Sequence, residues 1–183
     1  PYDPNDSTTW GAQSVCKSAK LGTDLSKASP VIGADGTVYF VDDTAAADRL
    51  IAVKPDCSQK WVINLLAGPG TASPAYWANP ASADTNDDLI FVGGDKLYAV
   101  TIWGGIKWSQ LVKTGAVEVA TVPGTPLVIN TTSGWRVYVV NSLGDLYRAN
   151  AGDGSSLTRV QDAALGVTHA SGSLAAYAYS GSD

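Results

Sequence analysis

The sequence predicts an all-β fold, and two observations support this. Short runs of β-branched and aromatic residues recur along the 183-residue chain, each bounded by Gly, Asp, Asn or Pro, as in short strands between turns. No window of about twelve residues has a helical period of apolar residues, and only the segments 43–48 and 161–165 are short helix candidates. The clearest strand runs are 38–41, 50–53, 89–92, 97–100 and 137–140.

These runs fall into three segments that share one order of signals. Each segment opens with a small residue and a proline, continues with a Val- and aromatic-rich run and then a run that begins with Leu, and closes at a Trp or Leu. The opening prolines are Pro30, Pro74 and Pro126, and the closing residues are Trp61, Trp108 and Leu157. A repeat of about 45 residues with four short strands is typical of a β-propeller blade.

We therefore expect a β-propeller of four-stranded antiparallel blades, with blades at about 28–66, 72–113 and 123–160. The small residue and the proline suit the innermost strand, because side chains near a propeller axis must be small. The strand that opens at Trp suits the outer edge, where a large ring covers the edge of the neighbouring blade.

Partial blades are expected at both ends of a single domain, 1–183, in the segments 8–20 and 165–183. Trp10 occupies the place of an outer strand, and 168–179 falls where a fourth inner strand is due. Two interpretations remain open: a fragment of a larger ring, or a four-bladed ring that the N-terminal strand closes. The fragment is favoured, because the last 16 residues are too few for three further strands and their turns.

Composition narrows the class of protein. The chain has 12 Lys+Arg and 17 Asp+Glu, a net charge of −5, and only 16% charged residues, against roughly 25% in average soluble domains. An acidic surface argues against a nucleic-acid partner, and no apolar run reaches the ~18 residues of a spanning helix. The chain has no Met and starts at Pro1, as after removal of a signal peptide. We expect an exported protein, in the periplasm, on the cell surface or outside the cell.

The repeats resemble the PQQ-like (pyrroloquinoline-quinone-type) β-propeller repeat family over about residues 8–160. The residues that carry the resemblance are SPVIGADGTVYF (29–40), LIAVKPDCSQKW (50–61), KLYAVTIWGGIKW (96–108) and VYVVNSLGDLYRANAGDGSSL (137–157). The third copy departs from the pattern at Leu157, where Trp is expected. The resemblance implies the fold, of a WD40-like or YVTN-like kind, more than an activity, because the repeat serves both dehydrogenases and scaffolds.

One activity that the resemblance suggests is that of a quinone-dependent dehydrogenase. Such an enzyme needs two adjacent cysteines over the quinone, a stacking Trp beneath it, and Glu, Asn and Asp ligands for calcium. This chain has only Cys16 and Cys57, so the adjacent pair is missing.

A candidate calcium loop lies between two strands of the second blade. Asp84, Asn86 and Asp88 place oxygen ligands on alternate residues, as calcium loops do. The downstream Gly and the bidentate Glu of an EF-hand are missing, so an acidic solvated turn is the alternative.

The two cysteines predict a disulfide between Cys16 and Cys57 in an exported protein. Both are expected at outer positions of adjacent blades, and the bridge would close about 40 residues and stabilise by around 3–4 kcal/mol. The alternatives are that either cysteine pairs with a missing part of the chain, or that both thiols are free.

Trp77 and Trp103 are the candidate binding-surface aromatics, because both are expected in loops or turns; packing against the adjacent blade is the alternative for each. The leading hypothesis is a non-catalytic exported scaffold that binds a protein, a glycan or the remaining propeller blades. The alternatives are a fragment of a quinone-dependent dehydrogenase and a subunit of an extracellular assembly whose blades another chain completes.

Overall fold

Twelve β-strands in three sheets form the described part of the computed structural model, which covers residues 28–43, 48–65, 72–80, 82, 84–113 and 120–160. The only helix in these ranges is one short 3-10 turn, η1 (Thr85–Asp87), so the all-β prediction is confirmed. Each sheet has four antiparallel strands that pair in chain order. We call the sheets blades 1, 2 and 3.

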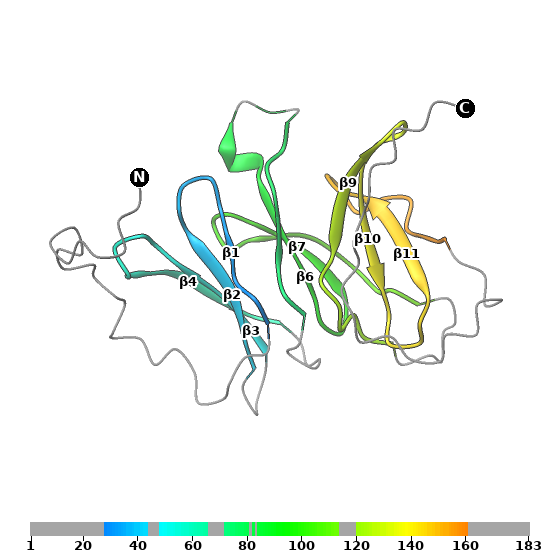
Figure 1. Ribbon diagram of the computed structural model, residues 1–183, viewed down its shortest axis with the longest axis horizontal. Helices are drawn as coiled ribbons and strands as arrows, with labels where there is room; N and C mark the ends of the chain where they lie inside the picture. Colours follow the sequence, from blue (N-terminus) through cyan, green and yellow to red (C-terminus); the bar gives the residue numbers. More distant parts are fainter. Residues whose placement is uncertain are drawn as a thin grey trace, which may run out of the picture.

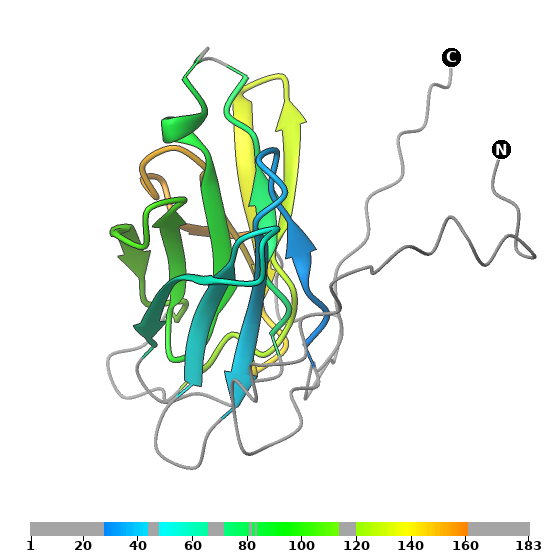
Figure 2. The ribbon, with the colours of Figure 1, turned by 90° about the vertical axis from the view of Figure 1, so that its left-hand side faces the viewer.

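Blade 1 contains β1 (Val31–Ile32), β2 (Val38–Asp43), β3 (Asp48–Val53) and β4 (Gln59–Asn64). Blade 2 contains β5 (Ala75–Trp77), β6 (Leu89–Gly93), β7 (Leu97–Thr101) and β8 (Ile106–Gln110). Blade 3 contains β9 (Leu127–Thr131), β10 (Gly134–Val140), β11 (Leu146–Asn150) and β12 (Thr158–Arg159). Figures 1 and 2 show the three sheets face to face, with blade 2 between the other two.

The apolar core lies between the blades. One cluster joins blades 1 and 2, and the other joins blades 2 and 3. Alternate residues of β6 enter different clusters: Ile90 faces blade 1, whereas Phe91 faces blade 3. Because side chains of a strand alternate between its two faces, the central strands of blade 2 are buried on both faces. This burial explains the low charge content of the sequence.

The outer-strand tryptophans of blades 1 and 2 dock onto the next blade, as the sequence predicts. The indole Nε1 of Trp61 donates a hydrogen bond to the carbonyl of Ile102 in blade 2, at 2.8 Å. The indole of Trp108 donates to the carbonyl of Ala151 in blade 3, at 3.1 Å. The two contacts occupy the same place in the repeat, in the turn between the third and fourth strands of the following blade.

The first strands of consecutive blades adjoin each other, β1 beside β5 and β5 beside β9. The backbone N–H of Ser29 donates to the hydroxyl of Ser73 at 2.7 Å, and both residues stand directly before the opening proline of their blade. This arrangement agrees with the expected place of the small residue and the proline on the inner strand.

Several sequence predictions lie outside the described residues: the partial blades at 8–20 and 165–183, Trp10, and most of the helix candidate at 43–48. In the described ranges, no helix has the length and apolarity to span a membrane.

Candidate ligand cleft between blades 1 and 2

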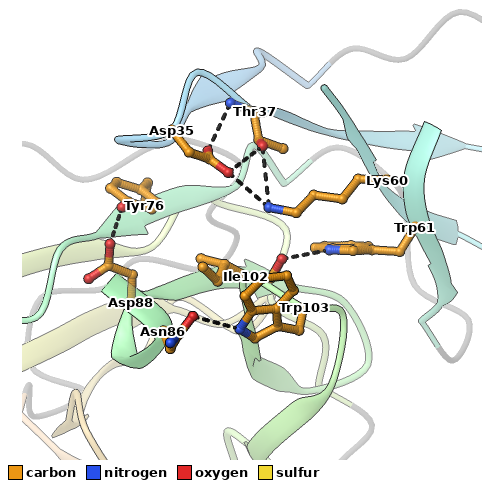
Figure 3. Close-up of polar contacts among 9 residues, drawn as sticks. All are labelled: Asp35, Thr37, Lys60, Trp61, Tyr76, Asn86, Asp88, Ile102 and Trp103. Carbon is orange, nitrogen blue, oxygen red and sulfur yellow. Dashed lines mark hydrogen bonds and ion pairs between the residues drawn. The ribbon is translucent and has the colours of Figure 1, made fainter. Parts of the chain in front are cut away.

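A cleft of about 360 Å³ opens where the β1–β2 turn of blade 1 faces η1 and the β7–β8 turn of blade 2. Its lining combines two aromatic rings with acidic, amide and ammonium groups. The lining residues are Ala34, Asp35, Lys60, Tyr76, Asn86, Asp88, Ile102 and Trp103. Figure 3 shows the polar contacts among them.

The wall from blade 1 is an ion pair between Asp35 and Lys60. The Nζ of Lys60 donates to Oδ2 of Asp35 at 2.9 Å, and the backbone N–H and hydroxyl of Thr37 donate to the same carboxylate at 2.9 and 2.8 Å. Partial burial alone would raise the pKa of Asp35, but these hydrogen bonds and the charge of Lys60 outweigh it and hold the pKa at about 2. Asp35 is therefore a fixed carboxylate at neutral pH.

The wall from blade 2 is a hydrogen-bonded pair between Tyr76 and Asp88 (Figure 3). The other oxygen of the buried Asp88 carboxylate accepts the backbone N–H of Asn79 at 2.9 Å. Burial and the hydrogen bond to Asp88 raise the pKa of Tyr76 to about 12. The Tyr76 ring stacks on Tyr39 of blade 1, with centroids 6.4 Å apart and planes 11° apart. Tyr76 therefore keeps its proton and stays in place.

Trp103 stands at the mouth of the cleft. It lies in the β7–β8 turn and is 64% exposed, although it is a large apolar side chain. Its Nε1 donates to the amide oxygen of Asn86 at 3.0 Å, and the Nζ of Lys60 lies 5.2 Å from its ring centroid. A hydrogen bond on one edge and a cation near the ring fix the indole while leaving it accessible.

The arrangement suits binding. Ligand sites in proteins are mainly apolar and contain a few placed polar groups that orient the ligand, and this cleft has both components. The pKa of Asp35 is lowered and the pKa of Tyr76 is raised, so both pKa values lie further from neutral pH than the ordinary values. General acid–base catalysis is most efficient with a pKa near the working pH, so neither group is tuned for proton transfer.

Each of the three candidate calcium ligands accepts hydrogen bonds from different partners. Asp84 accepts the backbone N–H of Asn86 at 2.9 Å, Asn86 accepts from Trp103, and Asp88 accepts from Tyr76 and Asn79. The described ranges contain no group of three or more His, Cys, Asp or Glu side chains arranged to hold a metal. Calcium binding by Asp84, Asn86 and Asp88 stays a prediction. An ion there would compete with the hydrogen-bond donors for the same oxygen atoms.

The two candidate surface tryptophans have opposite environments. The exposure of Trp103 is confirmed, whereas the prediction for Trp77 is wrong: Trp77 is only 6% exposed. Trp77 ends the inner strand β5, and its ring packs against Phe91 and against Trp135 of blade 3, with centroids 6.3 and 6.1 Å away. It contributes to the core between blades 2 and 3.

The predicted disulfide involves a residue outside the described ranges, Cys16. Cys57 lies in the β3–β4 turn with a φ of 69°, and no cysteine is free in the part that the structure describes. The Cys16–Cys57 bridge stays a prediction.

Sequence reasoning missed Asp35, Lys60 and Tyr76 as cleft residues. The sequence does indicate the local position of two of them. Lys60 stands directly before the docking Trp61, and Asp35 lies in an Asp-Gly turn. The contact of both with blade 2 depends on how the blades stack, which the repeat alone does not specify.

The comparisons with known proteins concern the fold. No family model and no curated protein matches the chain. Among solved structures, 19 chains match. One of them, a "Europium-containing methanol dehydrogenase", superimposes with a TM-score of 0.51 at 17% identity, over 73% of this chain and 24% of that chain. This chain therefore spans about a quarter of the length of that protein. At this identity the likeness shows the fold alone, a blade arrangement of the β-propeller kind.

Proposed function

We propose that this chain is a PQQ-like β-propeller scaffold of an exported protein, and that it binds a ligand in the cleft between blades 1 and 2 without transforming it. The observation that carries the proposal is Trp103, a 64% exposed indole held in place at the mouth of a 360 Å³ cleft. Large exposed aromatic side chains on rigid turns are typical of recognition surfaces.

The ligand class that fits best is a neutral glycan. The C–H groups of a sugar ring can pack on the face of Trp103, while ring hydroxyls can meet the polar groups at the edge of the indole. Asp35 supplies carboxylate oxygens, and the Asn86 amide supplies N–H donors. The ion pair of Asp35 with Lys60 balances the charge in this wall. In the other wall, both oxygens of the buried Asp88 carboxylate already accept hydrogen bonds from Tyr76 and Asn79. Together these contacts favour a neutral ligand over a charged one.

A titration tests the proposal. The probes are neutral hexasaccharides, one of β-linked glucose and one of β-linked N-acetylglucosamine, added to the folded chain in a calorimeter. We expect binding of at least one probe, and a loss of about twofold to tenfold in affinity for Trp103→Ala, because contact with one aromatic ring contributes about 0.5–1.5 kcal/mol. The matched control is Ile106→Ala, an exposed apolar residue of β8 that does not line the cleft. Failure of both probes to bind, or equal affinity in the two variants, would contradict the proposal.

A second candidate, a fragment of a quinone-dependent dehydrogenase, is favoured by the name of the structural neighbour. The residues present do not fit this cofactor: the two cysteines are 16 and 57 in the sequence, and the described ranges offer no metal-holding group of acidic, His or Cys side chains. We expect no dye-linked oxidation of methanol after addition of pyrroloquinoline quinone with Ca²⁺ or Eu³⁺. Turnover above the protein-free rate would replace the binding proposal with this one.

A further inference from the structure

A second pocket, of about 230 Å³, lies on blade 3 and has a different chemistry. Its lining is polar throughout: Ser133, Arg136, Arg148, Ser156 and Thr158. These residues come from the β9–β10 turn, the strands β10 and β11, the segment that leads into β12, and the start of β12 itself. The lining contains two guanidinium groups and no carboxylate, in a chain with a net charge of −5.

The two arginines lie on the face of blade 3 that points away from blade 2. Val137 and Ala149 pair across β10 and β11, and both belong to the core shared with blade 2. Arg136 and Arg148 are one residue removed from these positions along their strands, so they project from the opposite face. On that face Arg148 stands opposite Thr158 of β12.

The same positions in the other two blades are apolar. Ala52 stands opposite Trp61 in blade 1, and Ala99 stands opposite Trp108 in blade 2. Both alanines are fully buried under the following blade. In blade 3 the third residue of the Leu-Tyr-Arg-Ala run is Arg148, which is exposed, and no Trp faces it. The repeat therefore changes from an apolar pair to a cation and a hydroxyl at the pocket.

The side chains of the pocket are partly fixed. The Arg136 guanidinium donates to the amide oxygen of Asn150 and, at 3.4 Å, to the carbonyl of Trp135. The Thr158 hydroxyl donates to the carbonyl of Ser156 at 3.0 Å. The guanidinium of Arg148 has no hydrogen-bond or ion-pair partner among the described residues. One guanidinium is thus anchored and the other is available, with the Ser133 and Ser156 hydroxyls beside them.

We propose that this pocket binds a tetrahedral oxoanion, a phosphate or sulfate group, through Arg136 and Arg148. The guanidinium fork matches the geometry of such anions and forms charge-assisted hydrogen bonds with them. Serine hydroxyls supply further donors, and the volume accommodates the anion with its first waters. This inference does not rest on the cleft between blades 1 and 2.

The test is a calorimetric titration at low ionic strength with two kinds of probe. One arm uses inorganic phosphate and inorganic sulfate, and the other uses a sulfated disaccharide beside its unsulfated form. We expect Arg148→Gln to weaken binding at least about tenfold, and Arg148→Lys to lie between it and the wild type, because the ammonium keeps the charge without the fork. Lys107→Gln is the matched control, since it removes one positive charge from an exposed position of β8.

Each outcome decides the proposal. Binding of the inorganic anions assigns a site for the free ion, and binding of the sulfated disaccharide alone assigns a site for a group carried on a sugar. Absence of binding in both arms overturns the proposal, and so does an equal affinity in Arg148→Gln and Lys107→Gln. Circular dichroism of each variant establishes that the blades remain folded, and Arg148→Lys serves as the test variant if Arg148→Gln is unfolded.

Discussion

At the residue scale, Lys60 connects the two walls of the cleft. Its side chain is only 12% exposed, and its ammonium group donates to Asp35 of the same blade while it lies near the Trp103 ring of the next blade. A mostly covered charge is tolerated only with partners. Lys60 therefore keeps its position in the wall of the cleft.

The pKa of Asp35 tests this contact. Because the pKa in the folded protein is about 2, below the ordinary value of 3.8, the carboxylate adds stability above about pH 4 and loses it as the pH falls through 2. We expect Lys60→Gln to raise the pKa of Asp35 toward 3.8 and to shift the loss of this stability to higher pH. A carboxyl-carbon NMR titration measures the pKa directly. Lys107→Gln should leave it unchanged, and an unchanged value in Lys60→Gln would refute the role of the ion pair.

At the scale of elements, the turn between the third and fourth strands receives the docking tryptophan. Gly104 has a φ of +87°, and a Cβ on it would lie 2.9 Å from Cγ of Trp61. Gly154 has the same relation to Trp108, at 2.7 Å from Cδ2. A side chain at either glycine would push the ring away from its acceptor carbonyl.

Gly104→Ala and Gly134→Ala separate the backbone effect from the docking effect. Gly134 also has a positive φ, of +96°, but a Cβ there meets no atom within 4 Å. We expect Gly134→Ala to lower the free energy of unfolding by about 1–2 kcal/mol through backbone strain alone. Gly104→Ala should lower it by a further 1–3 kcal/mol, because overpacking adds to the strain. Urea denaturation measures both, and equal losses would show that the Trp61 contact adds nothing.

The elements were predictable where the signal is local. An opening proline, the strand runs and a closing Trp recur in the same order along the chain. This repeat predicted the three sheets and the docking of Trp61 and Trp108. The burial of Trp77 did not, because it depends on Trp135, a residue of the next blade. The roles of Asn86 and Asp88 escaped for the same reason: their partners Trp103 and Tyr76 become neighbours only in the folded sheet.

At the scale of the whole molecule, blade 2 takes part in both apolar cores of the described residues, whereas blades 1 and 3 each take part in one of them. Local opening costs little free energy where few apolar contacts hold a segment. Stability should therefore decrease from the central strands β6 and β7 toward the two-residue strands β1 and β12.

Hydrogen exchange measures this gradient. We expect the slowest amide exchange in β6 and β7, and the fastest strand exchange in β1 and β12. The comparison is made within one native sample, so solvent conditions are identical for all strands. Slowest exchange in blade 3 would show that the core between blades 1 and 2 contributes little to the stability of the middle blade.

The docked tryptophans also give the molecule a set of built-in optical reporters. Trp61 reports on the boundary between blades 1 and 2, Trp108 reports on the boundary between blades 2 and 3, and Trp103 lies in water at the cleft. If each of these tryptophans is replaced by Phe in turn, the difference between the fluorescence spectra of the wild type and the variant gives the emission of that tryptophan. The order in which the blades separate could then be read from fluorescence without any added label.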